Sequence, residues 1–273
     1  MDRRCFLRLA AGGIATASAA YWSPVSAKPK TPPPGADYFQ KIRNFDGDYL
    51  GDIILEDEEL SLLAEVVAHL RRVQANIGHG NFHLLGFDRM LSIGRNYSSV
   101  MPFKAREIEF MDRLFYEEAN HYGFFGEKLL THLTDNISKR EVVKIPRIGQ
   151  YMAKGKSIEI CREMQRAVGD DLILTSGVRG IVKQMYLFLN KALASKGNLS
   201  RASRSLAPPG YSYHAIGDFD VGQKGLGALN FTKTFATTKV YQRLTTLGFT
   251  EIRYPMDNLF GVRFEPWHIK IIS

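Results

Sequence analysis

The sequence predicts an α+β fold: a small, mostly antiparallel sheet with flanking helices, preceded by a mostly helical N-terminal region. Helical periodicity dominates residues 36–145, whereas short apolar strands alternate with helices from residue 146 onward. The 273 residues are 45% hydrophobic and 23% charged, a balance that excludes collagen-like and disordered chains. Because no apolar run approaches the roughly 20 residues that span a bilayer, a polytopic membrane protein is also excluded.

The first 27 residues are expected to be an export signal rather than part of the fold. Arg3-Arg4-Cys5-Phe6-Leu7-Arg8 resembles the twin-arginine signature, and a weakly apolar stretch, 9–20, follows it. Both Ala17-Ser18-Ala19 and Val25-Ser26-Ala27 fit a cleavage site. We favour the second because a Pro-rich linker, 28–35, comes directly after it. The mature protein is therefore expected in the periplasm or outside the cell, exported in the folded state.

The charge of the chain indicates an anionic partner rather than nucleic acid. Residues 1–27 contribute +2 of the formal net charge of +8, so the remaining residues carry +6. This excess suits a cell-wall polymer or peptide carboxylates, and it could equally serve solubility. Because the Lys and Arg residues are scattered, nucleic acid is not favoured. The two cysteines, Cys5 and Cys161, cannot form a disulfide framework.

The N-terminal region contains helical patterns but no recognisable chemistry. Apolar residues recur at three- and four-residue steps over 57–74, after an acidic first turn, which predicts an amphipathic helix. Further helices are expected over 103–120 and around 127–133, with Gly-punctuated loops such as 78–81 between them. This region, 36–145, is expected either to dock on the rest of the chain and restrict a cleft or to recruit a partner.

The C-terminal region, 146–273, mixes helices with short strands. Helices are expected over 157–168, 182–194 and 234–247, strands at 172–176 and near 214–221, a polar loop over 195–210, and β segments at 250–254 and 262–272. This order indicates an α+β domain.

Three clusters in the last hundred residues concentrate reactive side chains: 176–179, 209–220 and 265–268. Together they supply two histidines, aspartates and a further glutamate. A catalytic zinc site requires three protein ligands, an open position for water and a base beside it. The clusters therefore predict such a site.

Over roughly 172–272 these clusters resemble the VanY-type zinc D-alanyl-D-alanine carboxypeptidases, which are related in fold to VanX dipeptidases and the hedgehog signalling domain. Four motifs occur in the family's order. They are Ser176-Gly177-Val178-Arg179 with Gln184, Ser212-Tyr213-His214-Ala215-Ile216-Gly217, Arg253-Tyr254-Pro255, and Glu265-Pro266-Trp267-His268.

The resemblance implies a role for each matched residue. His214 and His268 would be zinc ligands, Glu265 the general base, and Arg179 a cation that faces the substrate. The residues expected to contribute to the substrate site are Ser176, Gln184, Ser212, Tyr213, Arg253 and Trp267.

The third ligand departs from the family pattern. The family's Asp falls seven residues after the His, but Val221 occupies that position here. A one-residue deletion after Gly217 aligns Asp220 with the ligand, so we favour Asp220 over Asp218. Strand alternation cannot decide between them, because two positions that differ by two face the same side.

The resemblance implies a zinc-dependent D,D-carboxypeptidase that removes the terminal D-alanine of peptidoglycan stem peptides. Related enzymes cut other bonds, including the L-alanyl-D-glutamate link, so an endopeptidase stays an alternative. Another is a catalytically silent zinc domain that binds cell-wall peptide or a protein partner. The sequence does not indicate a protein partner.

Several other patterns favour simpler explanations. His79 and His83 have the spacing of helical zinc ligands, but the glycines beside them argue against a helix and no Glu follows His79. The segment that begins at Asp218 resembles the start of a calcium loop, yet its twelfth position is Leu229. The glycines at 222–227 lack the Lys-Ser/Thr pair of a phosphate loop, and neither Ser176 nor Ser212 lies in a nucleophile elbow.

Overall fold

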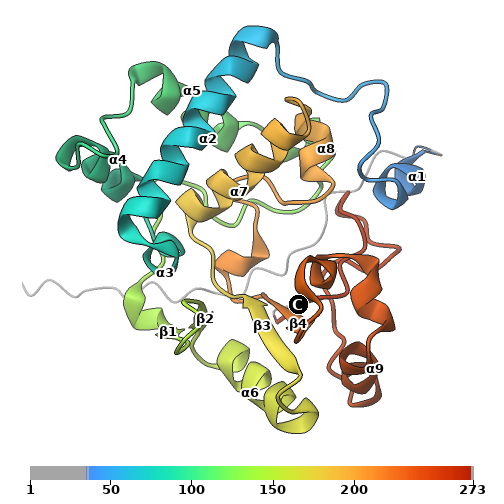
Figure 1. Ribbon diagram of the computed structural model, residues 1–273. Helices are drawn as coiled ribbons and strands as arrows, with labels where there is room; N and C mark the ends of the chain where they lie inside the picture. Colours follow the sequence, from blue (N-terminus) through green and yellow to red (C-terminus); the bar gives the residue numbers. More distant parts are fainter. Residues whose placement is uncertain (1–34, 36, 272–273) are drawn as a thin grey trace, which may run out of the picture.

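The computed structural model describes Gly35 and residues 37–271. The predicted export signal and most of the Pro-rich linker lie outside the described residues. The rest forms a helical half, at the top of Figure 1, and a half built on a small sheet, at the bottom. The α+β prediction is confirmed, with two small antiparallel sheets among the helices.

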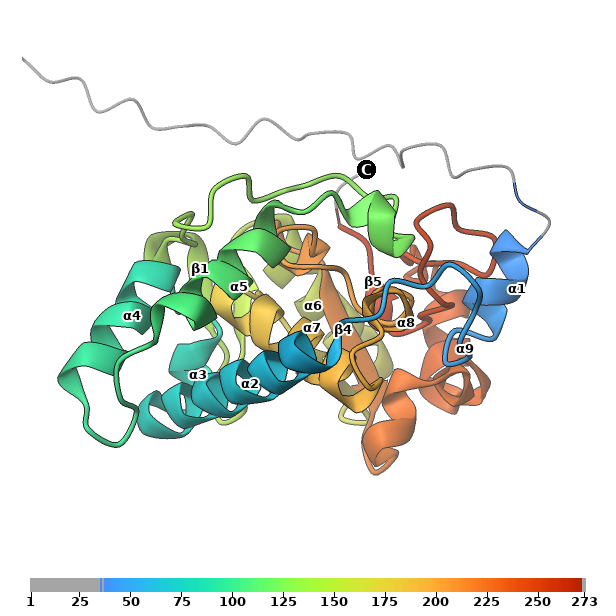
Figure 2. The same ribbon diagram turned by 90° about the horizontal axis from the view of Figure 1, so that it is seen from above.

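The helical half surrounds α7 (Ile181–Ala194), a mostly apolar helix. Three helices from the N-terminal region contact one another or α7: α2 (Asp57–Ile77), α4 (Phe87–Asn96) and α5 (Ala105–Tyr116). Figure 2 shows α2 lying alongside α7. The buried side chains of α2 recur at three- and four-residue steps, as its sequence pattern predicts. One hydrophobic core therefore contains residues from both sides of residue 145.

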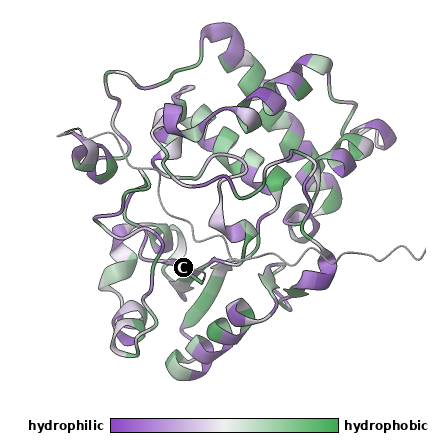
Figure 3. Ribbon diagram, turned by 180° about the vertical axis from the view of Figure 1, so that it is seen from behind, coloured by the Kyte–Doolittle hydropathy of each residue, from purple (hydrophilic) through white to green (hydrophobic). Residues whose placement is uncertain are grey.

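The second half is built on a three-stranded antiparallel sheet in the order β3 (Leu172–Ser176), β4 (Phe219–Gln223), β5 (His268–Ile269). Helices α6 (Lys156–Val168) and α9 (Lys239–Thr246) enclose a second hydrophobic core with it. In Figure 3, β3 is predominantly hydrophobic in colour. A separate hairpin, β1 (Val142–Lys144) and β2 (Tyr151–Ala153), lies beside this half.

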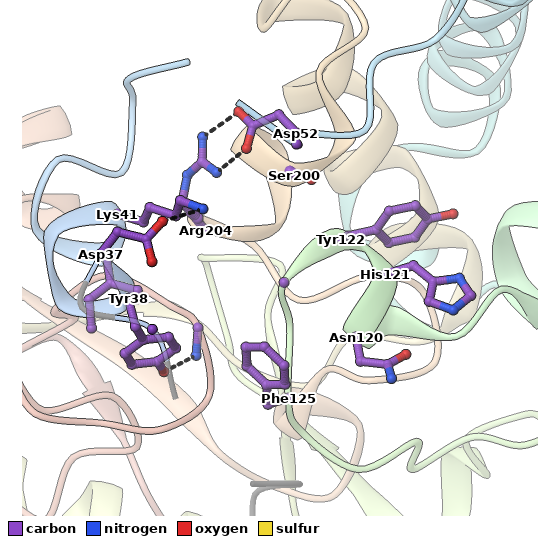
Figure 4. A pocket seen from close by; sticks show the side chains of 15 residues that line it. Asp37, Tyr38, Lys41, Asp52, Asn120, His121, Tyr122, Phe125, Ser200 and Arg204 are labelled. Atoms are coloured by element: carbon purple, nitrogen blue, oxygen red, sulfur yellow. Dashed lines mark hydrogen bonds and ion pairs between the residues drawn. The ribbon is translucent and has the colours of Figure 1, made fainter. Parts of the chain in front are cut away.

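The short helix α1 (Tyr38–Arg43) is fastened to the far end of the chain. The Tyr38 hydroxyl donates to the carbonyl of Asn258 and accepts from the amide of Gly261. Nearby, Arg204 pairs with Asp52 at 2.8 Å. Figure 4 shows Tyr38, Asp52 and Arg204 among the side chains around a cavity of about 350 Å³. It shares no lining residue with the cleft that contains Ser176, Asp220 and His268.

Several predicted elements differ in the structure. The helix expected over 103–120 is shorter, and the segment 127–133 is not helical. The loops at 78–81 and 195–210 contain short helices, and the strand near 214–221 begins only at Phe219. The short elements are α3 (His79–Phe82), α8 (Leu199–Ser203), and the 3₁₀ turns Ala119–Tyr122, Lys139–Glu141, Tyr213–Ala215, Gly227–Phe231 and Lys233–Thr237.

The C-terminal β segments are also shorter than expected. They reduce to β5 and a single bridge between Ile252 and Ile269. None of the helices in the described part of the chain combines the length and apolar character that crossing a membrane requires.

Candidate metal centre and substrate cleft

The sheet brings residues from three strands into one row. Ser176 on β3 pairs with Asp220 on β4, and Asp220 pairs with His268 on β5. The neighbours of Asp220, Phe219 and Val221, belong to the core beneath α6 and α9. Because successive strand side chains point to opposite faces, Asp220 and His268 face away from that core. The structure thus separates the reactive face of the sheet from its packed face.

His214 joins this row from the 3₁₀ turn before β4. Its Nε2 lies 3.3 Å from Oδ1 of Asp220, and Nδ1 of His268 lies 3.5 Å from the same oxygen. Ligand atoms of a tetrahedral zinc at about 2.0–2.1 Å are separated by roughly 3.3 Å. The ligand atoms of the three buried residues all lie within 4.8 Å of one another.

The donor atoms of this cluster fit a metal ion. Nε2 of His214 and Oδ1 of Asp220 are buried and have no hydrogen-bond partner among the described residues. Orphaned buried polar atoms cost free energy unless something satisfies them. Two imidazoles and one carboxylate are a donor set of catalytic zinc sites.

The opposite nitrogen of His214 is fixed by the backbone. Nδ1 donates to the carbonyl of Gly177 at 2.8 Å, which leaves Nε2 as the unprotonated nitrogen of a neutral ring. Burial and the nearby Arg179 lower the pKa of His214, so the neutral form is favoured. An added Cβ at Gly177 would lie 2.0 Å from the Tyr151 carbonyl oxygen, so this close approach requires glycine.

His268 is oriented by Asp218 rather than by the backbone. Its Nε2 donates to Oδ2 of Asp218 at 3.1 Å, which directs Nδ1 toward Asp220. Burial lowers the pKa of His268, but the hydrogen bonds to Asp218 and Glu265 outweigh it and raise the pKa to about 9 in the metal-free site. A divalent cation between these groups would displace that proton.

Asp218 has no capacity left for a metal. It also accepts from Nε of Arg253 at 2.8 Å and from the amide of Ile271 at 2.9 Å. Burial raises its pKa, but the bonds from His268 and Arg253 outweigh burial and hold the pKa below its usual range. The geometry therefore places Asp220, not Asp218, in the ligand cluster, and Asp218 supports a ligand from behind.

The second oxygen of Asp220 is occupied by Arg179. Nη2 of Arg179 donates to Oδ2 at 2.5 Å, and its Nε donates to Oγ of Ser176 at 2.8 Å. Arg179 was expected to face the substrate. It borders the cleft and at the same time orients a predicted metal ligand.

Glu265 reaches the cluster through a tight turn. The amide of His268 donates to the carbonyl of Glu265 across Pro266 and Trp267. In a regular strand, residues three apart would point to opposite faces, so this turn is what brings both side chains into one site. Oε2 of Glu265 lies 3.5 Å from Nδ1 of His268, and Oε1 lies 3.6 Å from Nε of Arg263. Glu265 therefore lies beside the cluster, where a base is needed.

The cluster opens into a cleft of about 540 Å³. The cleft is lined by His79, His83, Ile148, Gly149, Gln150, Thr175, Ser176, Arg179, Lys183, Leu187, Lys191, Ser205, Leu206, Asp220, Phe231, Arg263, Glu265, Trp267 and His268. A smaller recess adjoins it beside Glu265 and His268. Its other lining residues include Gln184, Ser205, Ser212, Tyr254 and Val262.

Four of the six predicted substrate-site residues border these spaces. Ser176 and Trp267 line the cleft, and Gln184 and Ser212 line the recess. Tyr213 and Arg253 do not, and the expectation for them needs correction. Arg253 is buried against Asp218 and stacks on the Tyr213 ring at 4.1 Å, so both support the site from behind.

Sequence reasoning missed two groups that the structure adds. The first is Asp218, which orients His268. The sequence pattern indicated Asp218 only as an alternative metal ligand to Asp220, so this role was missed. His83 and Lys183 line the cleft, although His83 was regarded only as a failed zinc pattern. The four-residue spacing of Lys183, Leu187 and Lys191 was the available signal, because it places all three on one face of a helix.

Comparison with known proteins matches the C-terminal part of the chain. Residues 152–273 match the family model of VanY, D-alanyl-D-alanine carboxypeptidase. No curated protein gives a significant match. The family match confirms the resemblance carried by the motifs and, with it, the expectation of an enzyme of carboxypeptidase type.

Two solved structures are similar. One is a point mutant of the vancomycin resistance D,D-pentapeptidase VanY, from a VanB-type resistance cassette, in complex with Zn(II). It is 24% identical to this chain, the match covers 49% of this chain and 79% of that chain, and the TM-score is 0.39. The other is VanYB in complex with D-alanine-D-alanine, with 24% identity, 49% and 77% covered, and a TM-score of 0.40.

The motifs, the ligand cluster and the family match coincide in one part of the chain. Residues 152–273, which carry His214, Asp220, Glu265 and His268, are therefore the part of the chain that is similar to the VanY D-alanyl-D-alanine carboxypeptidases.

Proposed function

We propose that the protein is a zinc-dependent D,D-carboxypeptidase that removes the terminal D-alanine from peptidoglycan stem peptides. The observation that carries the proposal is the buried convergence of His214, Asp220 and His268, with Glu265 beside them, at the bottom of an open cleft. The family match supports the reaction class. The solved relatives, one with zinc and one with D-alanine-D-alanine, suggest the metal and the substrate.

The proposed mechanism assigns one task to each residue. His214, Asp220 and His268 would hold zinc, which supplies Lewis-acid activation of water and of the scissile carbonyl when bound. Glu265 accepts the proton of the attacking water and then delivers it to the departing amine. Arg179 holds Asp220 in position, and its place in the cleft lining lets it meet the oxyanion or a substrate carboxylate.

The two spaces beside the cluster differ in size: the cleft has about 540 Å³, whereas the recess has about 20 Å³, room for about one water. The recess is small and lined by side chains that can hydrogen-bond, Gln184 and Ser212 among them. The Oε1 atom of Gln184 is buried without a partner among the described residues. We assign the stem peptide to the open cleft, because the recess is too small for an amino-acid residue.

Mass spectrometry of purified stem peptides tests the proposal. The zinc-loaded protein is expected to remove one terminal alanine, and Glu265→Gln is expected to be slower by about 10²–10⁴-fold because it loses the proton acceptor. An internal cut would identify an endopeptidase of the same fold. Unchanged peptides with zinc bound would contradict catalysis and favour a silent binding domain.

We also propose that the protein acts outside the cytoplasm, where this polymer lies. The support is the twin-arginine-like motif at 3–8. Replacing both Arg3 and Arg4 with Lys should retain the protein in the cytoplasm, which cell fractionation measures.

A further inference from the structure

One end of the cleft collects cationic and hydrogen-bonding groups that the proposed reaction does not use. Lys183 lies on the cleft face of α7, one turn after the Arg179 position and two turns before Lys191. His79 and His83, from the N-terminal region, line the same end. They are held there because the carbonyl of His83 accepts from the amide of Gly180 at 2.8 Å, directly before α7.

The charge of Lys183 is not compensated within the described part of the chain. Burial, together with the nearby Arg179, lowers its pKa to about 8, and no carboxylate acts on it. Its ammonium lies 5.8 Å from the centres of the Phe82 and Tyr186 rings. Lys191 differs because Asp46 acts on it. The uncompensated charge therefore centres on Lys183.

His83 provides an independent sign that this end binds a ligand. Its side chain is 5% exposed, and its Nδ1 has no hydrogen-bond partner among the residues that the structure describes. Burial and the nearby Lys183 and Arg179 lower its pKa to about 4, so the ring is neutral near pH 7. A neutral imidazole with a free nitrogen can form a hydrogen bond to a bound group.

We propose that Lys183 and His83 form a subsite for a side-chain carboxylate of the substrate peptide, located upstream of the bond that is cut. The proposal rests on the proposed function, which places the stem peptide in the open cleft that Lys183 and His83 line. Lys183 is the ion-pair partner of the carboxylate, and His83 is its hydrogen-bond partner. The N-terminal region, through His83, thereby contributes to specificity for an acidic stem.

The test uses two peptides that end in D-alanyl-D-alanine and differ at one upstream residue. In one peptide its side-chain carboxylate is free, and in the other it is a primary amide. The full chain should show kcat/KM at least about 10-fold higher for the acidic peptide, because a hydrogen-bonded charge is lost with the amide. In Lys183→Met this ratio should fall to about 1, with kcat/KM for the amide peptide retained. Lys239→Met, an exposed position on α9, is the matched control and should keep the preference.

Two further measurements separate this inference from folding and from the proposed function. Lys183→Met should raise Tm, since it removes an uncompensated charge, and a lower Tm would overturn the premise. Calorimetry with the two product peptides, which lack the terminal alanine, should show the acidic peptide binding at least about 10-fold more tightly, and this preference should also be lost in Lys183→Met.

Each remaining outcome has a defined meaning. Equal cleavage and equal binding of the two peptides overturns the subsite while the carboxypeptidase stands. Binding preference without any cleavage supports the subsite and contradicts the proposed reaction. If Lys183→Met slows both peptides equally and the wild type has no preference, Lys183 contacts the terminal carboxylate and the upstream assignment is wrong.

Discussion

At the scale of single residues, the site depends on how Asp218 and Asp220 divide two tasks. Asp220 leaves one oxygen for the metal cluster, whereas Asp218 uses its oxygens on His268, Arg253 and the amide of Ile271. The sequence predicted one strand containing both, but β4 begins at Phe219, so Asp218 lies directly before the strand. The sequence could not choose between them, because that choice depends on Arg253, thirty-five residues away in sequence. The family alignment supplied Asp220, and the hydrogen bonds explain it.

Asp218→Asn should therefore lower both the stability of the protein and its affinity for zinc. It leaves the buried Arg253 without its charge partner, so the free energy of unfolding should fall by about 3–5 kcal/mol in urea denaturation. Zinc affinity should also fall by roughly 10–100-fold, because His268 loses its orienting carboxylate. Asp171→Asn, at an exposed position, should change the free energy of unfolding by less than about 0.5 kcal/mol. A loss below about 1 kcal/mol in Asp218→Asn would contradict the assigned role.

At the scale of elements, periodicity predicted helices well where one face is buried. The observed α2, α6 and α7 agree with the expected ranges to within a few residues. The helix prediction for 127–133 was wrong because Leu130 and Leu133 are buried in an irregular stretch, where the amides of Leu129 and Leu130 donate to the carbonyl of Gly210. The strand expected near 214–221 failed at its start because Gly217 has a φ of +117°, which ends the turn before β4. The hydrogen bonds to Gly210 are long-range contacts, which leave no local pattern in the sequence.

The connection after β3 yields a prediction at the same scale. In Gly177→Ala the new Cβ meets the Tyr151 carbonyl, so the backbone that orients His214 must move. We expect a loss of stability of about 1–3 kcal/mol and weaker zinc binding, measured by urea denaturation and by competition with a chelator dye. Gly80→Ala is the control, because its Cβ would make only an ordinary contact at 3.4 Å. Unchanged zinc affinity in Gly177→Ala would show that this carbonyl does not position His214.

At the scale of the whole molecule, the two regions that the sequence pattern distinguishes share one core. Helices from 36–145 pack on α7, and the same region supplies His79 and His83 to the cleft. The sequence left open whether this region restricts a cleft or recruits a partner, because an amphipathic face does not identify what covers it. The packing supports the first of these alternatives.

Metal loading should stabilise this shared structure as a unit. The cluster joins two strands and the turn before β4, so binding is possible only when the sheet is formed. At a free zinc concentration 100 times Kd, a ligand specific to the folded state adds about 2.7 kcal/mol, so Tm should rise by several degrees and return on chelation. Asp220→Asn should remove most of this shift. Two probes test whether both halves unfold as one cooperative unit: tryptophan fluorescence reports on Trp267 among the described residues, and far-UV circular dichroism reports mainly on the helices. In a single unit, zinc should shift both unfolding transitions together. A zinc effect on the fluorescence transition alone would show that the helical half unfolds independently.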